Sequence, residues 1–205
     1  MKRAVTVYAE VTPNPSTMKF VTDLMLVNGG ETAEFLSAQE AKGYSSLALE
    51  LFNFPFVKSL FFANNFITVT KTETLEWDYI VKELRDFIKN WIETKETFIE
   101  KIPSAREIET GDGDAKTIVS EKPVLETEID KLIHNLLEEY VKPAVESDGG
   151  AIDFKSFDDV TGVVTVVLRG SCSGCPSATA TLKGGIESLL KAQCPEVQEV
   201  VALEG

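Results

Sequence analysis

The chain has 205 residues, of which 43% are hydrophobic and 26% charged, with a net charge of −13. This composition is typical of a globular protein with one large or two small cores. An acidic surface repels phosphate backbones and anionic lipids, so neither nucleic acid nor a membrane is expected as a partner. No apolar run reaches the roughly 20 residues that a membrane-spanning helix needs.

The cysteine content and the first residues bear on the compartment. Three cysteines, two of them in a Cys-x-x-Cys, do not form the framework of a disulfide-rich secreted protein. Residues 1–10 contain no sustained apolar core and no cleavage site of a secretory signal. We therefore expect a cytoplasmic protein.

Residues 1–102 are predicted to form an α+β domain. Alternating or β-branched runs predict strands at 4–11 and 18–22, and a hairpin of two strands turns at Asn64-Asn65. A short capped helix is expected at 45–52. Apolar residues at helical spacing between Trp77 and Trp91 predict one long amphipathic helix.

Residues 103–124 are predicted to be a flexible linker. The segment is rich in polar residues, contains Gly-Asp-Gly and is flanked by prolines, a composition that favours an extended connection between two domains. The predicted architecture is two small α+β domains joined by this linker.

Residues 125–205 are predicted to form the second α+β domain. Thr127 to Asp130 has the pattern of a capping box, and the apolar stripe that follows predicts a helix that Pro143 ends or kinks. Strands are expected at 152–155, 163–168 and 197–203, and a helix at 176–191. This domain has six basic and 14 acidic residues, a net charge of −8.

The pair Cys172 and Cys175 carries the most chemistry. It follows a β-branched strand and directly precedes Pro176, a residue that favours the first turn of a helix. The positive end of that helix, directed at Cys175, favours the thiolate that binds metals and attacks disulfides. Three interpretations remain open: an iron–sulfur cluster held by four thiolates of two chains, a thiol–disulfide redox pair, and structural zinc at a dimer axis.

Two further candidate ligands are set aside. Cys194 is a lone cysteine at the end of a helix, and a lone cysteine is more often a small buried hydrophobic residue than a ligand. His134 has no second ligand nearby at metal-binding spacing, so a solvated or capping role is expected.

Longer motifs around these residues resemble a known family. Asp148-Gly149-Gly150, the run 170–177 with both cysteines, and the run 181–187 resemble the C-terminal domain of NifU-like (Nfu) iron–sulfur proteins. Residues 12–20 and 60–71 resemble the Nfu N-terminal domain.

The resemblance implies a function for the cysteine pair. Such a protein is an iron–sulfur cluster scaffold or carrier and not an enzyme. Cys172 and Cys175 of two protomers would hold one [4Fe–4S] cluster between them, so that the loaded form is a homodimer. The cluster would come from an upstream assembly scaffold and pass to apo-proteins, and the N-terminal domain is expected to be a docking module.

Overall fold

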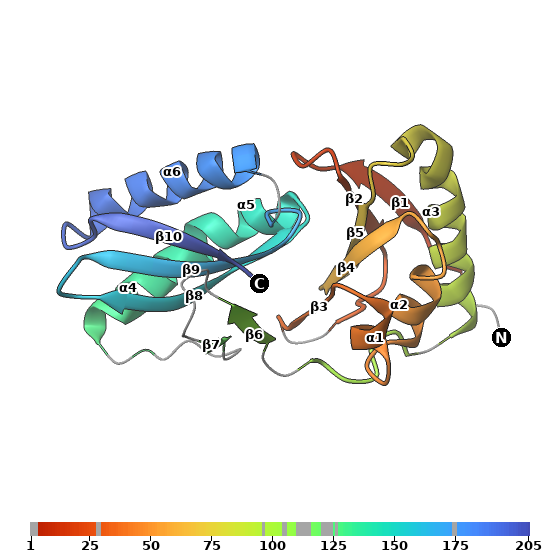
Figure 1. Cartoon of the computed structure of the whole chain (residues 1–205), viewed down its shortest axis with the longest axis horizontal. Helices are drawn as coiled ribbons and strands as arrows, with labels where there is room; N and C mark the ends of the chain where they lie inside the picture. Colours follow the sequence, from red (N-terminus) through yellow and green to blue (C-terminus); the bar gives the residue numbers. More distant parts are fainter. Residues whose placement is uncertain are drawn as a thin grey trace. The chain divides into compact units, whose positions relative to one another are not determined.

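The computed structural model describes residues 4–27, 30–95, 97–103, 106–109, 116–119, 125, 127–173 and 176–205. The chain divides into two compact units, Met1–Pro103 and Ser104–Gly205, each of which contains both helices and a sheet (Figure 1). Each unit is described by itself below. The predicted α+β class is confirmed for both.

The N-terminal unit is built on one antiparallel sheet with the strand order β1-β2-β5-β4-β3. In the described part of this unit, three helices accompany the sheet. Its elements are β1 (Val7–Val11), β2 (Thr17–Thr22), β3 (Thr32–Phe35), α1 (Ala38–Ala41), α2 (Ser46–Leu51), β4 (Val57–Ala63), β5 (Phe66–Lys71) and α3 (Trp77–Thr94).

The predicted hairpin is formed by β4 and β5, in which Ala63 pairs with Phe66. Asn64 has a φ of +43° at the turn, and asparagine adopts this left-handed region more readily than most residues. The carbonyl oxygen of Asn64 accepts hydrogen bonds from the backbone N–H groups of Leu26 and Val27, at 2.7 and 3.0 Å. The turn therefore also anchors the segment that follows β2.

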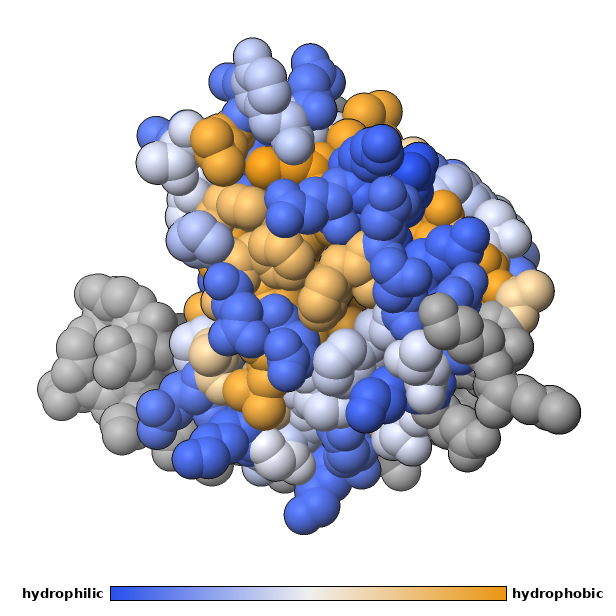
Figure 2. All heavy atoms as spheres, turned by 90° about the vertical axis from the view of Figure 1, so that its right-hand side faces the viewer, coloured by the Kyte–Doolittle hydropathy of each residue, from blue (hydrophilic) through white to orange (hydrophobic). Residues whose placement is uncertain are grey.

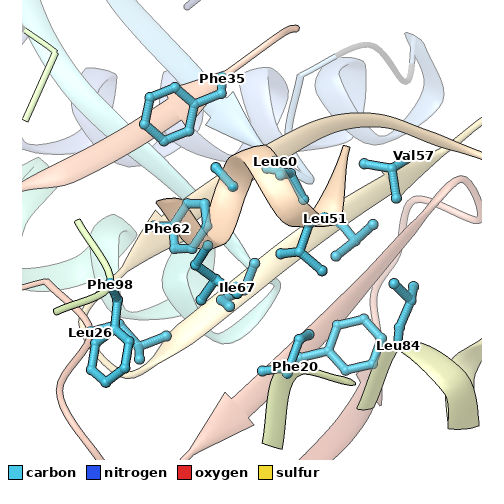
Figure 3. Packing of buried hydrophobic residues seen from close by; sticks show 14 of the residues in the cluster. Phe20, Leu26, Phe35, Leu51, Val57, Leu60, Phe62, Ile67, Leu84 and Phe98 are labelled. Carbon is cyan, nitrogen blue, oxygen red and sulfur yellow. The ribbon is translucent and has the colours of Figure 1, made fainter. Parts of the chain in front are cut away.

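Helix α3 covers the sheet with one apolar face, as its spacing predicted. Ile80, Leu84, Ile88 and Ile92 recur every four residues, and all are buried. Figure 3 shows Leu84 with Phe20 of β2 among the residues of this core. The four-residue repeat brings successive side chains to one face of a helix, which explains why this helix was predictable.

Aromatic side chains cluster beside this core. Phe54 meets Phe87 of α3 edge to face at 5.2 Å between ring centroids, and Phe87 stacks with Trp91 at 6.2 Å. These three residues are partly exposed. Figure 2 shows the face of the molecule on the right of Figure 1, where hydrophobic side chains gather in a recess bordered by hydrophilic ones. The expected docking role of this unit stays a prediction.

The segment 103–124 contains structure that the linker prediction did not include. Strand β6 (Arg106–Glu109) pairs antiparallel with β7 (Lys116–Val119). Ile108, Ile118 and Val119 are β-branched residues, which favour strands. The stretches 110–115 and 120–124 of the predicted linker lie outside the described residues.

The remainder of the C-terminal unit packs helices against one face of a three-stranded sheet, β10-β9-β8. Strands β8 and β9 are antiparallel, whereas β9 and β10 are parallel and are connected through α6. Its elements are α4 (Glu128–Leu136), η1 (Leu137–Val141), α5 (Lys142–Ser147), β8 (Gly150–Asp158), β9 (Val163–Gly170), α6 (Pro176–Gln193) and β10 (Glu199–Glu204).

The first helix of this unit begins as predicted but continues further. Thr127 and Asp130 form the capping box: Asp130 N–H donates to Thr127 Oγ1 at 3.0 Å, and Thr127 N–H donates to Asp130 Oδ2 at 2.8 Å. Pro143 does not end the helix, because a π-helical turn, η1, precedes it and α5 continues beyond it. Proline lacks an N–H and its ring clashes with an α-helical carbonyl, and a wider turn accommodates both constraints.

In the part of the chain that the structure describes, no helix has the length and apolar character to cross a membrane.

Candidate metal centre

Cys172 lies in a tight turn between the end of β9 and the start of α6. Gly170 has a φ of +67°, a left-handed conformation that favours glycine. Two groups of Ser173 donate to the carbonyl oxygen of Gly170: the backbone N–H at 3.2 Å and the hydroxyl at 2.9 Å. The turn leaves Cys172 8% exposed.

The turn formed by Asp148, Gly149 and Gly150 supports Cys172 from the other side. Ser171 donates its hydroxyl to the carbonyl oxygen of Asp148 and its N–H to that of Gly149, at 3.2 Å. These bonds join the end of β9 to the segment that precedes β8. The residues just before the cysteine are thus fixed to a turn more than 20 residues earlier in the chain.

Gly150 is required by this close approach. A Cβ atom at position 150 would lie 2.7 Å from Cys172 Sγ and 2.7 Å from the carbonyl oxygen of Arg169. Gly150 and Gly170 are directly paired in the β8–β9 ladder. The sulfur therefore occupies the volume that any larger residue at position 150 would fill.

The main chain of Cys172 is also tied to α6. Thr179, in the first part of that helix, donates its hydroxyl to the carbonyl oxygen of Cys172 at 3.1 Å. Threonine hydroxyls inside helices commonly bond to a carbonyl three or four residues earlier, whereas this one reaches back seven residues and outside the helix.

The surroundings of Cys172 favour its neutral thiol form. Burial raises the pKa of Cys172, the contact with the Ser171 hydroxyl lowers it, and the negative charge of Asp148 raises it further. A metal ion binds the thiolate, so binding at this position releases a proton. Packing against Gly150 therefore fixes the position of the sulfur, while the surroundings disfavour its charged thiolate form.

Of the two predicted ligands, the structure places Cys172. Cys175 lies outside the described residues, as does Gly174, so ligation by the pair stays a prediction. Among the described residues, no three His, Cys, Asp or Glu side chains gather into a group that could hold a metal ion.

Cys194 is a core residue, as expected. It is 1% exposed and its N–H donates to the carbonyl of Leu190 at the end of α6, at 2.7 Å. Its Sγ donates to Glu196 Oε2 at 3.2 Å. Burial and the neighbouring carboxylate of Glu196 raise the pKa of this thiol.

His134 lies in the last turn of α4 and is half-buried, so its expected solvated or capping role stays a prediction. Its ring lies beside that of Phe154, with centroids 6.5 Å apart, and its Nδ1 is buried without a hydrogen-bond partner among the described residues. Ile133 next to it points fully into the core, which draws this part of α4 close to β8.

The sequence marked Gly150 and the run 170–177, which contains Ser171, only as parts of longer motifs, and it predicted no role for Thr179. The contact with Cys172 depends on strand register, which short sequence patterns do not specify.

Comparison with known proteins bears on the whole chain. The family described as "Scaffold protein Nfu/NifU N terminal" matches residues 7–95, and the "NifU-like domain" family matches residues 133–201. The "NFU1 iron-sulfur cluster scaffold homolog, mitochondrial" of Drosophila willistoni is 34% identical over 97% of this chain and 64% of its own length. The "NifU-like protein, mitochondrial" of Saccharomyces cerevisiae is 31% identical over 98% of this chain and 82% of its own length.

A solved structure, the solution structure of a NifU-like protein from Saccharomyces cerevisiae, is 24% identical over 47% of this chain and 86% of its own length, with a TM-score of 0.43. The chain spans slightly less than two thirds, 64%, of the Drosophila willistoni relative.

These matches place both units in one class, the proteins that combine an Nfu N-terminal domain with a NifU-like domain. The chain belongs to the NifU-like (Nfu) family, as its motifs predicted.

The expected cytoplasmic location is wrong. The relatives from Drosophila willistoni, Arabidopsis thaliana and Saccharomyces cerevisiae are all named mitochondrial, which points to the mitochondrion. The expectation rested on cysteine content and on a missing secretory signal. Mitochondrial transit peptides are amphipathic and rich in arginine, so the absence of an apolar signal core does not separate the two compartments.

Proposed function

We propose that this protein is a scaffold and carrier for iron–sulfur clusters. In this proposal Cys172 and Cys175 of two protomers hold one [4Fe–4S] cluster as a homodimer, receive it from an upstream scaffold and deliver it to apo-proteins. The observation that carries the proposal is the placement of Cys172 in a preformed turn, with its sulfur against Gly150. Membership in a family with relatives named as iron–sulfur scaffolds supports it.

The ligand count leads to a shared site. Iron–sulfur clusters are commonly held by four cysteine thiolates, and the chain has three cysteines. Cys194 is buried in the core and hydrogen-bonded to Glu196, which leaves the pair at 172 and 175. Two chains that each contribute this pair complete the set.

Transfer then proceeds by ligand exchange. An incoming cysteine of the target forms a new iron–sulfur bond as a bond to Cys172 or Cys175 breaks. The incoming thiol loses a proton and the departing thiolate gains one, so the exchange needs no oxidant or reductant. With two ligands on each chain, four such steps release the cluster.

Charge favours basic partners. Residues 125–205 carry six basic and 14 acidic residues, and complementary charge increases the rate of association at low salt. High salt is therefore expected to slow delivery to a target and to leave the bound cluster intact.

Anaerobic reconstitution with iron and sulfide tests the proposal. We expect a brown dimer with about four irons per two chains, measured by absorbance, iron and sulfide analysis and mass in solution. Cys172→Ser and Cys175→Ser should each abolish it, while Cys194→Ser serves as the matched control that keeps it. A colourless monomer that cycles a disulfide would instead establish redox chemistry, and a colourless zinc-bound dimer a structural metal site.

A further inference from the structure

Hydrogen bonds from three hydroxyl side chains surround the backbone of Cys172. Ser171 joins it to the turn before β8, and Ser173 closes the turn onto Gly170. The third bond comes from α6: the hydroxyl of Thr179 donates to the carbonyl oxygen of Cys172 itself, at 3.1 Å. Between Cys172 and Thr179 lies the segment that carries Cys175.

We infer that Thr179 is a positioning residue that slows the loss of the cluster by holding the backbone of Cys172. This inference rests on the proposed function. For the sulfur of Cys172 to leave an iron atom, either its side chain rotates or its backbone moves. Gly150 lies against the side chain, and the Thr179 bond resists rotation of the adjoining peptide.

A second hydroxyl in α6 shows how the Thr179 bond differs from the usual side-chain hydrogen bonds of helical residues. Ser188 donates its hydroxyl to the carbonyl of Gly184, four residues earlier in the same helix, at 2.8 Å. That bond is the usual local type for a helical serine. Thr179 makes a bond of the same kind to the proposed ligand instead, so Ser188 offers a chemically matched control.

The test uses the full-length chain loaded anaerobically with a cluster. Thr179→Val removes the hydroxyl and keeps the shape, Thr179→Ser keeps the hydroxyl, and Ser188→Ala removes the control bond. Ferrozine is added in excess, and loss of cluster absorbance is followed with time. We expect Thr179→Val to lose its cluster roughly two to ten times faster than the parent protein, the range that one hydrogen bond supports.

Three comparisons decide the outcome. Thr179→Ser should release at close to the parent rate, Ser188→Ala should match the parent, and the thermal unfolding midpoints of the metal-free Thr179→Val and Ser188→Ala proteins should agree closely. Equal release rates for Thr179→Val and Ser188→Ala would overturn the inference, as would rapid release by Thr179→Ser. Thr179→Ala replaces Thr179→Val, with the same criteria, if the valine variant does not fold.

The inference and the proposed function fail differently. A parent protein that takes up no cluster overturns both. A parent that loads normally, with Thr179→Val unchanged in release, overturns the role of Thr179 and leaves the carrier function standing.

Discussion

The sulfur of Cys172 packs directly against the backbone of Gly150: a Cβ atom added at position 150 would lie 2.7 Å from Cys172 Sγ. The two lie 22 positions apart in sequence, and the β8–β9 ladder brings them together. The position of a proposed cluster ligand thus depends on a residue without a side chain.

Gly150→Ala is therefore expected to displace Cys172. The added methyl group would also lie 2.7 Å from the carbonyl of Arg169, and overpacking of this kind typically costs about 1–3 kcal/mol in the free energy of unfolding. Iron content per chain after reconstitution should fall by at least half. Chemical denaturation and iron analysis measure the two effects.

Gly162→Ala is the matched control for this prediction. Its Cβ atom would lie 2.6 Å from the carbonyl of Glu196 and its φ is +72°, so alanine is strained here at least as much as at position 150, but away from Cys172. This variant should be destabilised and still bind a normal amount of iron. If both variants lose iron equally, the loss reflects general instability of the unit and Gly150 has no specific role.

The two cores predict separable effects of core mutations. Leu84 of α3 and Leu190 of α6 are both 0% exposed and belong to different clusters. Replacing either leucine with alanine should cost about 2–5 kcal/mol in the unit concerned. In the full chain, Leu84→Ala should keep its iron and Leu190→Ala should lose much of it, as measured after reconstitution. Loss of iron in Leu84→Ala would show that the N-terminal core is needed for cluster binding.

The left-handed turn at Asn64 predicts different effects of two substitutions. Glycine adopts a φ of +43° without steric cost, whereas valine is strained there. Asn64→Gly should leave the unfolding midpoint nearly unchanged, and Asn64→Val should lower stability by about 1–3 kcal/mol. Thermal unfolding followed by circular dichroism distinguishes the two. Equal stability of both variants would contradict the assigned backbone conformation.

Cys194 predicts a pH dependence of stability. Burial and Glu196 raise the pKa of this thiol above its unfolded value of about 8.5. A raised pKa stabilises the folded state fully below the unfolded pKa, and that contribution is lost as the pH rises through the folded pKa. The difference in unfolding free energy between the parent and Cys194→Ala should thus shrink from pH 7 to pH 10. A constant difference across this range would contradict the raised pKa.

Short sequence patterns correctly predicted several helices and turns of the fold. The capping box at Thr127, the four-residue repeat of α3 and the asparagine turn of the β4–β5 hairpin each lie within a few neighbouring residues, and each was found. Strand β3 was not predicted, because its four residues are defined by pairing with β4 across an intervening helical segment.

The site was predictable in its chemistry and not in its geometry. Cysteine type and spacing marked Cys172 and Cys175 as the proposed ligands. The contacts of Cys172 with Gly150 and Thr179 depend on strand register and on where α6 packs, and these follow from packing of the whole unit. The π-helical turn before Pro143 was unpredictable for the same reason. The sequence shows that an α-helix is disfavoured at the proline, whereas packing in the core determines that a π-helical turn forms there.

The burial of Cys172 has a consequence for the metal-free form of the proposed carrier. A thiol that is 8% exposed and packed against backbone offers little access to peroxide or to a stray disulfide. The packing that holds the sulfur in place is therefore expected to shield it from irreversible oxidation. In the proposed carrier, the glycine turn around Cys172 would then lengthen the time over which the metal-free form stays able to accept a cluster.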